Sequence, residues 1–125
     1  MEHPAAVGID IIEIARIRKA LENHPEAFLE KIFTEEERSY CMGHRDPSPH
    51  LAARFAAKEA AVKALGVGFR EGISWQDIWV RKDPLGKPLL ELSSSLRKSF
   101  PAAIFLLSMS HDKSSAIAIV YAYNL

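Results

Sequence analysis

The 125-residue sequence has few of the features that mark secreted, membrane or nucleic-acid-binding proteins. It contains one cysteine, Cys41, so no disulfide forms within the chain and a reducing, cytoplasmic setting is expected. No apolar run is long enough to span a bilayer, and the segment MEHPAAVGID has neither the basic start nor the apolar core of a signal peptide. Basic and acidic residues both number 16, so the net charge is zero and the electrostatic footprint of a nucleic-acid binder is absent. We therefore expect neither a membrane nor a nucleic acid as partner.

Two common kinds of site are also missing from the sequence. No GxxxxGK[ST] motif is present, which excludes a P-loop, and no Cys/His spacing indicates zinc. The hydrophobic fraction of 48% and the charged fraction of 26% are typical of a globular protein rather than a disordered one. At this length we expect one domain, residues 1–125, with one core.

The first half of the chain predicts one strand and then helices. Apolar residues alternate in VGIDII, at 7–12, which favours a strand with Asp10 between isoleucines. A capping-box pattern joins Thr34 and Glu37, and Pro25 suits a helix start. The helices predicted from these signals and from helical spacing cover 13–24, 25–33, 34–40 and 48–66.

The second half predicts two hairpins. The stretch 73–81 and LLEL, at 89–92, read as strands around a turn, and IFLLSMS and AIAIVYAY, at 104–110 and 116–123, form a second pair. A short helix is expected over SSSLRKSF, at 93–100. Helices followed by hairpins favour an α+β fold, a single domain with a long central helix packed against a largely antiparallel sheet.

The predicted central helix carries charges on an otherwise apolar segment, RFAAKEAAVKALG, at 54–66. At about 100° per residue, bulky side chains form one stripe and alanines the other, so the helix is expected to be packed on several sides. Arg54 and Lys58 lie in one lane between these faces, and Glu59 and Lys63 lie in the other. Such charges are costly to bury unless something pairs with them.

Asp10 and the helix charges each have an ordinary interpretation. Asp10 can face solvent from the polar side of an edge strand, and Glu59 can form an i,i+4 pair with Lys63. Arg54 and Lys58 can extend along a half-buried face with their charged ends in water. Taken together, however, two carboxylates and several cations are what a Mg²⁺–phosphate site requires.

Six motifs occur in an order that identifies a family. They are GID at 8–10, IFTEEE at 32–37, RFAAKEAAVKALG at 54–66, SWQDIWV at 74–80, DPLGKP at 83–88 and SMSH at 108–111. The sequence closely resembles the holo-acyl-carrier-protein synthases, the small type of 4′-phosphopantetheinyl transferase. The resemblance implies a 4′-phosphopantetheinyl transferase-like fold. It also implies an enzyme of fatty acid biosynthesis that moves phosphopantetheine from coenzyme A to a serine of apo acyl carrier protein and releases adenosine 3′,5′-bisphosphate.

The resemblance also implies roles for particular residues. Asp10 and Glu59 become the Mg²⁺ ligands, and Lys63 contacts the pyrophosphate of coenzyme A, so these three form the expected catalytic set. The residues expected along the nucleotide are Arg54, Gly66, Pro88 and His111, with Lys58 and Lys87 as secondary candidates.

Arg54 and His111 are the expected partners of the 3′-phosphate, although His111 alone is also typical of a turn. Ligand charge, rather than a protein partner, would then compensate the charges of the central helix. Glu59 and a metal-bound water are both candidates to accept the proton of the serine.

The family assembles as a homotrimer with active sites between subunits, and it binds its acidic carrier through basic residues of the first helix and the segment after it. Here Arg16 and Lys31 fit that description, while Glu26 and Ala27 dilute the positive charge. Lys19 fits equally well as part of a solvated helix face. Two alternatives stay open: a Mg²⁺-dependent hydrolase of coenzyme A, and a non-catalytic module that binds carrier proteins.

Overall fold

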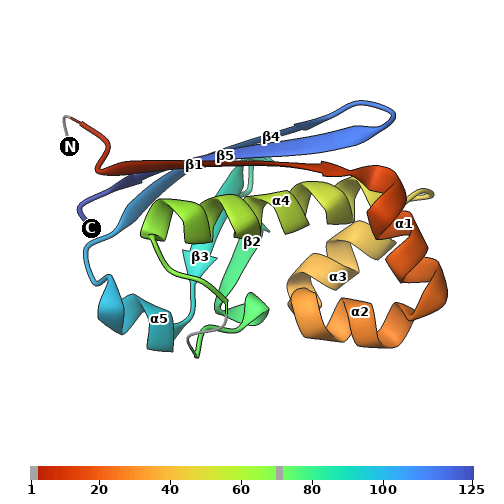
Figure 1. Cartoon of the computed structure of the whole chain (residues 1–125), viewed down its shortest axis with the longest axis horizontal. Coiled ribbons are helices and arrows are strands. Elements are labelled where there is room, and N and C mark those ends of the chain that lie inside the picture. The colour runs from red at the N-terminus through yellow and green to blue at the C-terminus, as the bar shows by residue number, and fades with distance from the viewer. Residues whose placement is uncertain (1–2, 70–71) are drawn as a thin grey trace.

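A long helix, α4 (Ser48–Leu65), packs against one face of an antiparallel sheet and forms the centre of the fold (Figure 1). The computed structural model describes residues 3–69 and 72–125. The sheet has the order β1–β5–β4, with β1 (Ala6–Glu13) and β4 (Ile104–His111) on either side of β5 (Ser115–Tyr123). The predicted α+β class, with its central helix and antiparallel sheet, is confirmed.

Three short helices follow β1 and lie together beside one half of α4 (Figure 1). They are α1 (Ile14–Asn23), α2 (Pro25–Ile32) and α3 (Glu35–Met42). The capping box predicted for α3 is present: Thr34 Oγ1 accepts from the Glu37 backbone N–H at 3.3 Å, and Glu37 Oε1 accepts from the Thr34 N–H at 3.0 Å. The predicted succession of helices is therefore confirmed.

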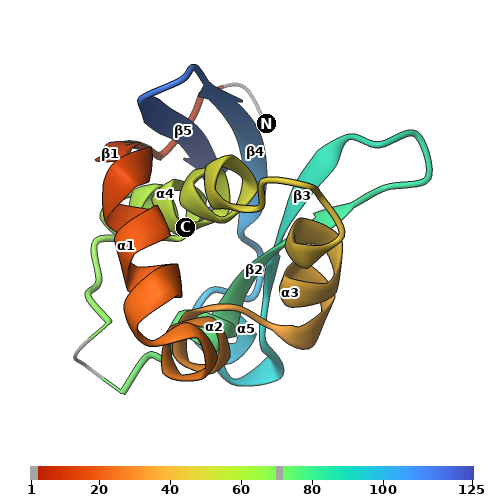
Figure 2. The same ribbon diagram turned by 90° about the vertical axis from the view of Figure 1, so that its right-hand side faces the viewer.

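The hairpin of β2 (Ile78–Lys82) and β3 (Pro88–Leu92) forms a separate two-stranded sheet whose turn extends away from the body of the molecule (Figure 2). Helix α5 (Ser94–Ser99) follows it. The strand predicted over 73–81 is wrong at its start, because Trp75–Asp77 form a 3₁₀ turn, η1. Ser74 and Asp77 bond to nearby backbone N–H groups there, a local pattern that competes with a sheet ladder. The other predicted parts of the two hairpins are confirmed.

Helix α4 is buried on nearly all sides, as its composition predicts. It contacts β1, β5 and β4 of the sheet on one side and α1, α3 and β2 on others. Its alanines make the contact with the sheet very close. A Cβ added at Gly8 of β1 would lie 1.9 Å from the carbonyl oxygen of Ala60. Only glycine fits at this crossing of strand and helix.

The outer face of the three-stranded sheet is apolar and exposed. Val7, Ile9 and Ile11 point outward from β1 with 55%, 52% and 65% of their surface accessible. Across the sheet, Val7 pairs with Tyr121 of β5, which in turn pairs with Leu106 of β4. No described element covers this face in Figure 1. Contiguous apolar surface of this kind is typical of a site of association.

Candidate active site

Asp10 and Glu59 come together in one pocket of about 220 Å³, which we call the carboxylate pocket. Its lining is Asp10, Ile11, Ile12, Arg16, Phe55 and Glu59. Asp10 shares the inner face of β1 with Gly8 and Ile12, because strand side chains alternate. Its side chain is only 18% exposed, so the alternative that Asp10 faces solvent is wrong, although β1 is an edge strand.

Lys63 completes the charge cluster at the carboxylate pocket. Its ammonium lies 3.1 Å from Asp10 Oδ1 and donates to the carbonyl oxygen of Ile9 at 2.9 Å. Glu59 and Lys63 lie one turn apart on α4, so both face β1. Lys63 was expected to form an ion pair with Glu59 on the same helix. It forms one with Asp10 of β1 instead.

The carboxylate pocket favours a cation. Burial raises the pKa of Glu59, the negative charge of Asp10 raises that pKa further, and Lys63 lowers it. Two carboxylates held together at the cost of desolvation and mutual repulsion bind a positive ion well. Within residues 3–69 and 72–125, however, no group of three or more His, Cys, Asp or Glu side chains is arranged to hold a metal. Two carboxylates alone suit an ion that takes its other ligands from phosphate and water, as Mg²⁺ does.

An aromatic stack forms one wall of the carboxylate pocket. The ring of Phe55, which lines the pocket, stacks on Trp75 with centroids 4.9 Å apart, and Trp75 stacks on Phe69 at 3.9 Å. The stack joins α4 to the segments that carry Phe69 and Trp75. Through Phe55 it gives the pocket an apolar side next to its charged side.

The close approach of β1 to α4 sets the geometry of this pocket. We expect Gly8→Ala to push the strand from the helix, because the new methyl group would meet backbone atoms of Ala60 and Ala64 that cannot rotate away. Overpacking of this kind costs about 1–3 kcal/mol of the free energy of unfolding, and it also separates Asp10 from Glu59. Thermal unfolding and affinity for Mg²⁺ measure the two effects. Gly43→Ala is the matched control, since its Cβ would lie 3.4 Å from the nearest atom. If Gly8→Ala behaves like Gly43→Ala, the close contact has no role.

A second pocket, of about 250 Å³, gathers positive charge, and we call it the cationic pocket. Its polar lining is Tyr40, His50, Arg54, Lys82, Ser110 and His111. Pro88 also lines it, at the start of β3. Arg54 is 3% exposed, its guanidinium lies 4.4 Å from the centre of the Tyr40 ring, and its Nε is buried without a hydrogen-bond partner.

The two pockets share no residue. Arg54 and Glu59 both belong to α4, but five residues of helix turn their side chains about 140° apart. The paired carboxylates and the cations therefore lie in two separate pockets.

Comparison with known proteins assigns the family. A family model described as the 4′-phosphopantetheinyl transferase superfamily matches residues 6–120. The holo-[acyl-carrier-protein] synthase of Syntrophotalea carbinolica is 48% identical to this chain over 123 residues, which cover 96% of both. The chain belongs to the holo-acyl-carrier-protein synthases. The predicted family is confirmed, and with it the assignment of the chain as an enzyme, a 4′-phosphopantetheinyl transferase.

Solved structures of other holo-acyl-carrier-protein synthases share the fold. The Helicobacter pylori enzyme in complex with coenzyme A matches with a TM-score of 0.85 and 38% identity, covering 94% of this chain and 99% of that one. The Neisseria meningitidis enzyme matches with a TM-score of 0.88 and 34% identity, covering 97% and 99%. The structural match extends over nearly the whole of both chains.

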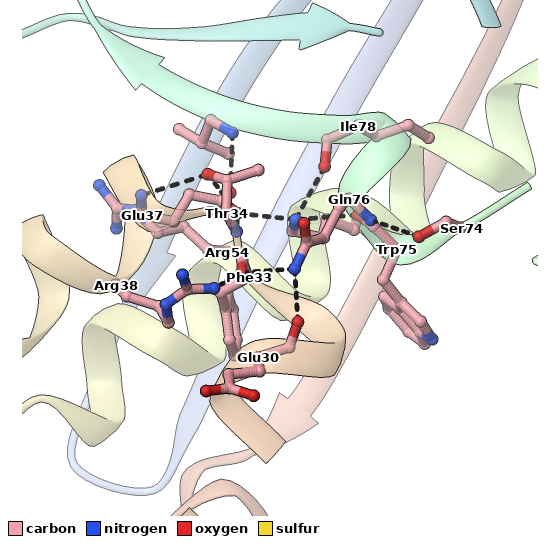
Figure 3. Close-up of polar contacts among 12 residues, drawn as sticks. Glu30, Phe33, Thr34, Glu37, Arg38, Arg54, Ser74, Trp75, Gln76 and Ile78 are labelled. Carbon is pink, nitrogen blue, oxygen red and sulfur yellow. Dashed lines mark hydrogen bonds and ion pairs between the residues drawn. The ribbon is translucent and has the colours of Figure 1, made fainter. Parts of the chain in front are cut away.

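Lys58 differs from what the resemblance implied. Its ammonium is completely buried, lies 2.7 Å from Glu37 Oε1, and donates to the carbonyl oxygens of Ile78 and Trp75 at 2.8 and 3.0 Å. Figure 3 labels its partners Glu37, Trp75 and Ile78 among the residues whose bonds hold the 74–78 segment on the helices. The idea that ligand charge compensates the cations of α4 is therefore wrong for Lys58, which has a protein partner. It is also incomplete for Lys63, which pairs with Asp10.

The other predicted nucleotide residues fall in different places. The structure brings Arg54, Pro88 and His111 together in the cationic pocket. Gly66 and Lys87 line neither pocket: Gly66 ends α4 with a left-handed φ of 73°, and exposed Lys87 lies in the turn between β2 and β3. Their roles toward the nucleotide stay predictions.

Four polar residues of the cationic pocket are absent from the sequence-based set: Tyr40, His50, Lys82 and Ser110, the last of which lies in the SMSH motif. His50 precedes Arg54 by four residues, so helical spacing could have identified it. Tyr40 and Lys82 come from α3 and β2, and no signal in the sequence joins those elements to α4.

Of the predicted docking residues, Arg16 has the most informative position. It projects from α1 and lines the carboxylate pocket, next to Asp10 and Glu59. Lys19 and Lys31 are both exposed, on α1 and α2. In the described part of the chain, no helix combines the length and apolar character needed to cross a membrane.

Proposed function

We propose that this chain transfers the 4′-phosphopantetheine group of coenzyme A to a serine of an apo acyl carrier protein, with adenosine 3′,5′-bisphosphate as the second product, at a Mg²⁺ site formed by Asp10 and Glu59. One observation carries the proposal: in a member of this family, the two carboxylates predicted as metal ligands line a single pocket beside Lys63. The complex of the Helicobacter pylori relative with coenzyme A supports the same substrate.

The carboxylate pocket suits Mg²⁺. Asp10 and Glu59 offer oxygen ligands, and the pocket has room for ligand oxygens and water. Burial and the negative charge of Asp10 raise the pKa of Glu59, and a bound cation would offset both effects. When bound there, Mg²⁺ polarises the phosphorus and neutralises charge on the pyrophosphate.

The residues around the metal site would position the two substrates. Lys63 lies close enough to Asp10 to place its ammonium on the pyrophosphate, where negative charge develops as the phosphoanhydride bond breaks. The serine oxygen would bond to the β-phosphorus as the bond from that phosphorus to the bridging oxygen breaks, and the bridging oxygen would leave with adenosine 3′,5′-bisphosphate. The hydroxyl proton would pass to Glu59 or to a water at the metal site. The Phe55–Trp75 stack gives an apolar wall for the uncharged pantetheine arm.

The carrier would dock over α1. Arg16 lies at the carboxylate pocket, so a carrier bound to its guanidinium brings the acceptor serine close to the proposed metal site. Exposed cations on α1 and α2 would orient an acidic carrier before contact. Lys19 and Lys31 lie farther along these helices and extend the same surface.

The cationic pocket would bind the 3′-phosphate of the nucleotide through Arg54 and His111. Because this pocket and the carboxylate pocket are separate in one chain, we infer that the full site forms between two copies. One copy would supply Asp10, Glu59 and Lys63, and its neighbour the cations.

A homotrimer, the assembly that the family resemblance implies, would also cover the outer face of the sheet. Rows of apolar side chains cross this face from β1 through β5 to β4. Their burial between copies gains about 25 cal/mol for each Å² removed from water. The face ends near His111, so association there would bring a neighbouring copy to the cationic pocket. A cytoplasmic location stays a prediction from the lone thiol of Cys41.

We expect Leu106→Glu to dissociate the trimer and abolish transfer, because it places a charge in the middle of the apolar face. Sedimentation velocity measures the assembly, and the transfer rate measures the consequence. Leu85→Glu is the matched control, since Leu85 is 95% exposed but lies at the tip of the β2–β3 turn. A trimer that survives Leu106→Glu would exclude this face as the interface.

Mixed trimers test the division of the site between copies. Asp10→Asn and Arg54→Ala are each expected to be inactive alone. When the two variants are mixed and allowed to exchange subunits, some interfaces pair an intact carboxylate pocket with an intact cationic pocket. Activity should then reappear. Continued inactivity after proven exchange would place both halves in one chain.

A transfer assay tests the function itself. The protein is incubated with coenzyme A, Mg²⁺ and an apo carrier, and the carrier is weighed by mass spectrometry. A gain of one phosphopantetheine group supports the transferase. Free phosphopantetheine without a heavier carrier would indicate the hydrolase, and no turnover with carrier binding would indicate the non-catalytic module.

A further inference from the structure

Three histidines meet at the cationic pocket. The rings of His44 and His50 are stacked, with centroids 3.7 Å apart and planes at 23°, and His111 meets the other side of His50 at 5.9 Å and 70°. Tyr40 packs edge-on against His44 and His50. The histidines come from the loop after α3, the first turn of α4 and the end of β4, so tertiary packing alone assembles them.

The groups facing His50 are mostly positive. Arg54 lies one turn further along α4, and its Nη1 donates to the His50 carbonyl oxygen at 3.2 Å. The ammonium of Lys82, from β2, lies 4.6 Å from the centre of the Tyr40 ring. Two acidic side chains lie at the edges of the cationic pocket: Glu36 lines an adjacent pocket with Tyr40, Arg54 and Lys82, and Asp112 lines another with His111. Within residues 3–69 and 72–125, none of His50, Arg54, Lys82 and His111 forms an ion pair.

The positive charges grouped in this pocket favour the binding of an anion. The buried Nε of Arg54 has no hydrogen-bond partner among the described residues, although buried polar atoms are nearly always bonded. A phosphate placed among Arg54, His50 and His111 would satisfy it and neutralise the surrounding charge. A phosphomonoester dianion fits best, because it offers three acceptor oxygens to several donors.

We propose that His50 is a third binding residue for the terminal phosphate of the nucleotide, and that its imidazole takes up a proton from solvent as the phosphate binds. The proposal rests on the proposed function, which places the 3′-phosphate of coenzyme A in this pocket. It adds a residue that the family motifs do not contain, and it makes nucleotide affinity depend on pH.

The surroundings of His50 favour proton uptake. Burial lowers the pKa of His50, and His44, Arg54, His111 and Lys82 lower it further, so the free pocket holds this ring neutral at pH 7. A bound dianion offsets those positive charges and raises the pKa. If the pKa of a histidine rises when the ligand binds, its protonated form adds to the affinity at pH values below the raised pKa. This added affinity is lost as the pH rises through the raised pKa.

The orientation of His44 supports this arrangement. Its Nδ1 lies 3.0 Å from the Tyr40 carbonyl oxygen and 3.3 Å from that of Cys41, which fixes Nδ1 as the donor. The ring is thereby held flat against His50 and keeps it directed toward the pocket. His44 thus acts as a positioning residue for His50.

Calorimetry of ligand binding tests the proposal. Coenzyme A and its 3′-dephospho analogue are titrated into the intact protein at pH 7 and pH 8, in buffers that differ in ionisation enthalpy, and the protons taken up are counted. The natural protein should take up more protons with coenzyme A than with the analogue. Its affinity for coenzyme A should fall by up to about tenfold from pH 7 to pH 8, the limit for one linked proton.

Two variants isolate His50. His50→Gln should weaken coenzyme A about tenfold at pH 7 and bring proton uptake down to the level of the analogue, while binding of the analogue is unchanged. His50→Phe keeps an aromatic ring against His44 but holds no proton, so it should show the same loss. His24→Gln, at an exposed site between α1 and α2, should behave like the natural protein.

The possible outcomes separate the two proposals. Unchanged proton uptake in both His50 variants would overturn the role of His50 while leaving the transferase intact. No binding of coenzyme A to the natural protein would instead overturn the proposed function. Inorganic phosphate is titrated in parallel: weak binding supports a nucleotide phosphate, whereas binding as tight as that of coenzyme A would show a free-phosphate site and overturn the assignment.

Discussion

Replacing Asp10 by asparagine or Glu59 by glutamine is expected to reduce transfer at least about a thousandfold. Each substitution keeps the size of the side chain and removes one of two charged metal ligands. A bound cation stabilises the transition state by several kcal/mol, and each 1.4 kcal/mol corresponds to about tenfold in rate. Both variants should remain folded. Asp10 pairs with a lysine that is half exposed, so losing this pair costs little stability.

The measurement combines the rate of carrier modification with a Mg²⁺ titration and a thermal melt. Glu13→Gln is the matched control, because Glu13 lies on the same strand but is exposed and outside the carboxylate pocket. It should keep the natural rate and Mg²⁺ dependence. Near-natural rates for both variants in chelator-treated buffer would exclude the metal site. A normal rate for one alone would leave the other as the single essential ligand.

The fold could be predicted where local signals and hydrophobic spacing agreed. The capping box of Thr34 and Glu37, and the alanine-rich segment ending at Gly66, fixed α3 and α4 without tertiary information. The strand predicted over 73–81 was wrong at its start. Apolar Ile73 and Trp75 indicated a strand there, but Ser74 and Asp77 accept hydrogen bonds from nearby backbone N–H groups and form a turn. Such local bonds decide between two conformations that apolar spacing alone does not separate.

The sequence predicted Asp10, Glu59, Lys63 and Arg54 as candidate site residues. It did not predict that they lie in two separate pockets. Helical spacing separates the lane of Glu59 and Lys63 from that of Arg54, and the structure keeps this separation. Residue spacing alone could not show that β1 brings Asp10 to Glu59, since this depends on the close approach of Gly8 to Ala60, and only the family resemblance predicted the pair. Nor could it show the histidine stack of the cationic pocket, whose members come from three segments.

The outward side chains of β1 show a second limit of sequence reasoning. Alternation over 7–12 favours a strand, and the usual interpretation places its apolar residues against the core. In the structure, Gly8 and Asp10 face α4, whereas Val7, Ile9 and Ile11 face outward. At Gly8 the close approach of α4 leaves no room for a side chain, and Asp10 and Ile12 share this inner face with it. A partner copy would bury the outward apolar residues instead.

The buried pair of Lys58 and Glu37 is expected to dominate the stability of the fold. Lys58→Met should lower the free energy of unfolding by about 3–5 kcal/mol, because it leaves a carboxylate buried without its counter-charge. Methionine has nearly the same length and shape, so little of this loss comes from a cavity. Glu37→Gln should also be destabilising, because it leaves the ammonium of Lys58 buried without its counter-charge. The amide oxygen of glutamine can still accept from the Val80 N–H, which donates to Glu37 Oε2 at 2.8 Å.

The double variant separates the pair from its surroundings. In Lys58→Met with Glu37→Gln, neither side chain carries a charge, so the double variant should be more stable than the sum of the two losses predicts, by about 1–3 kcal/mol. Recovery should be partial, since the carbonyl oxygens of Trp75 and Ile78 lose their donor. Those two carbonyls hold the segment that carries Trp75, so Lys58→Met should also loosen the stack on Phe55 and change the fluorescence of Trp75.

A surface pair in the β2–β3 hairpin gives the matched control. Arg81 and Glu91 are 2.7 Å apart across β2 and β3 but lie partly in solvent, where an ion pair contributes little to stability. Arg81→Met should therefore change the denaturation midpoint only slightly. If Lys58→Met costs no more than Arg81→Met in chemical denaturation, the buried ammonium does not anchor α4 to the 74–78 segment. The position of Trp75 beside the carboxylate pocket would then depend on its aromatic contacts with Phe55 and Phe69 alone.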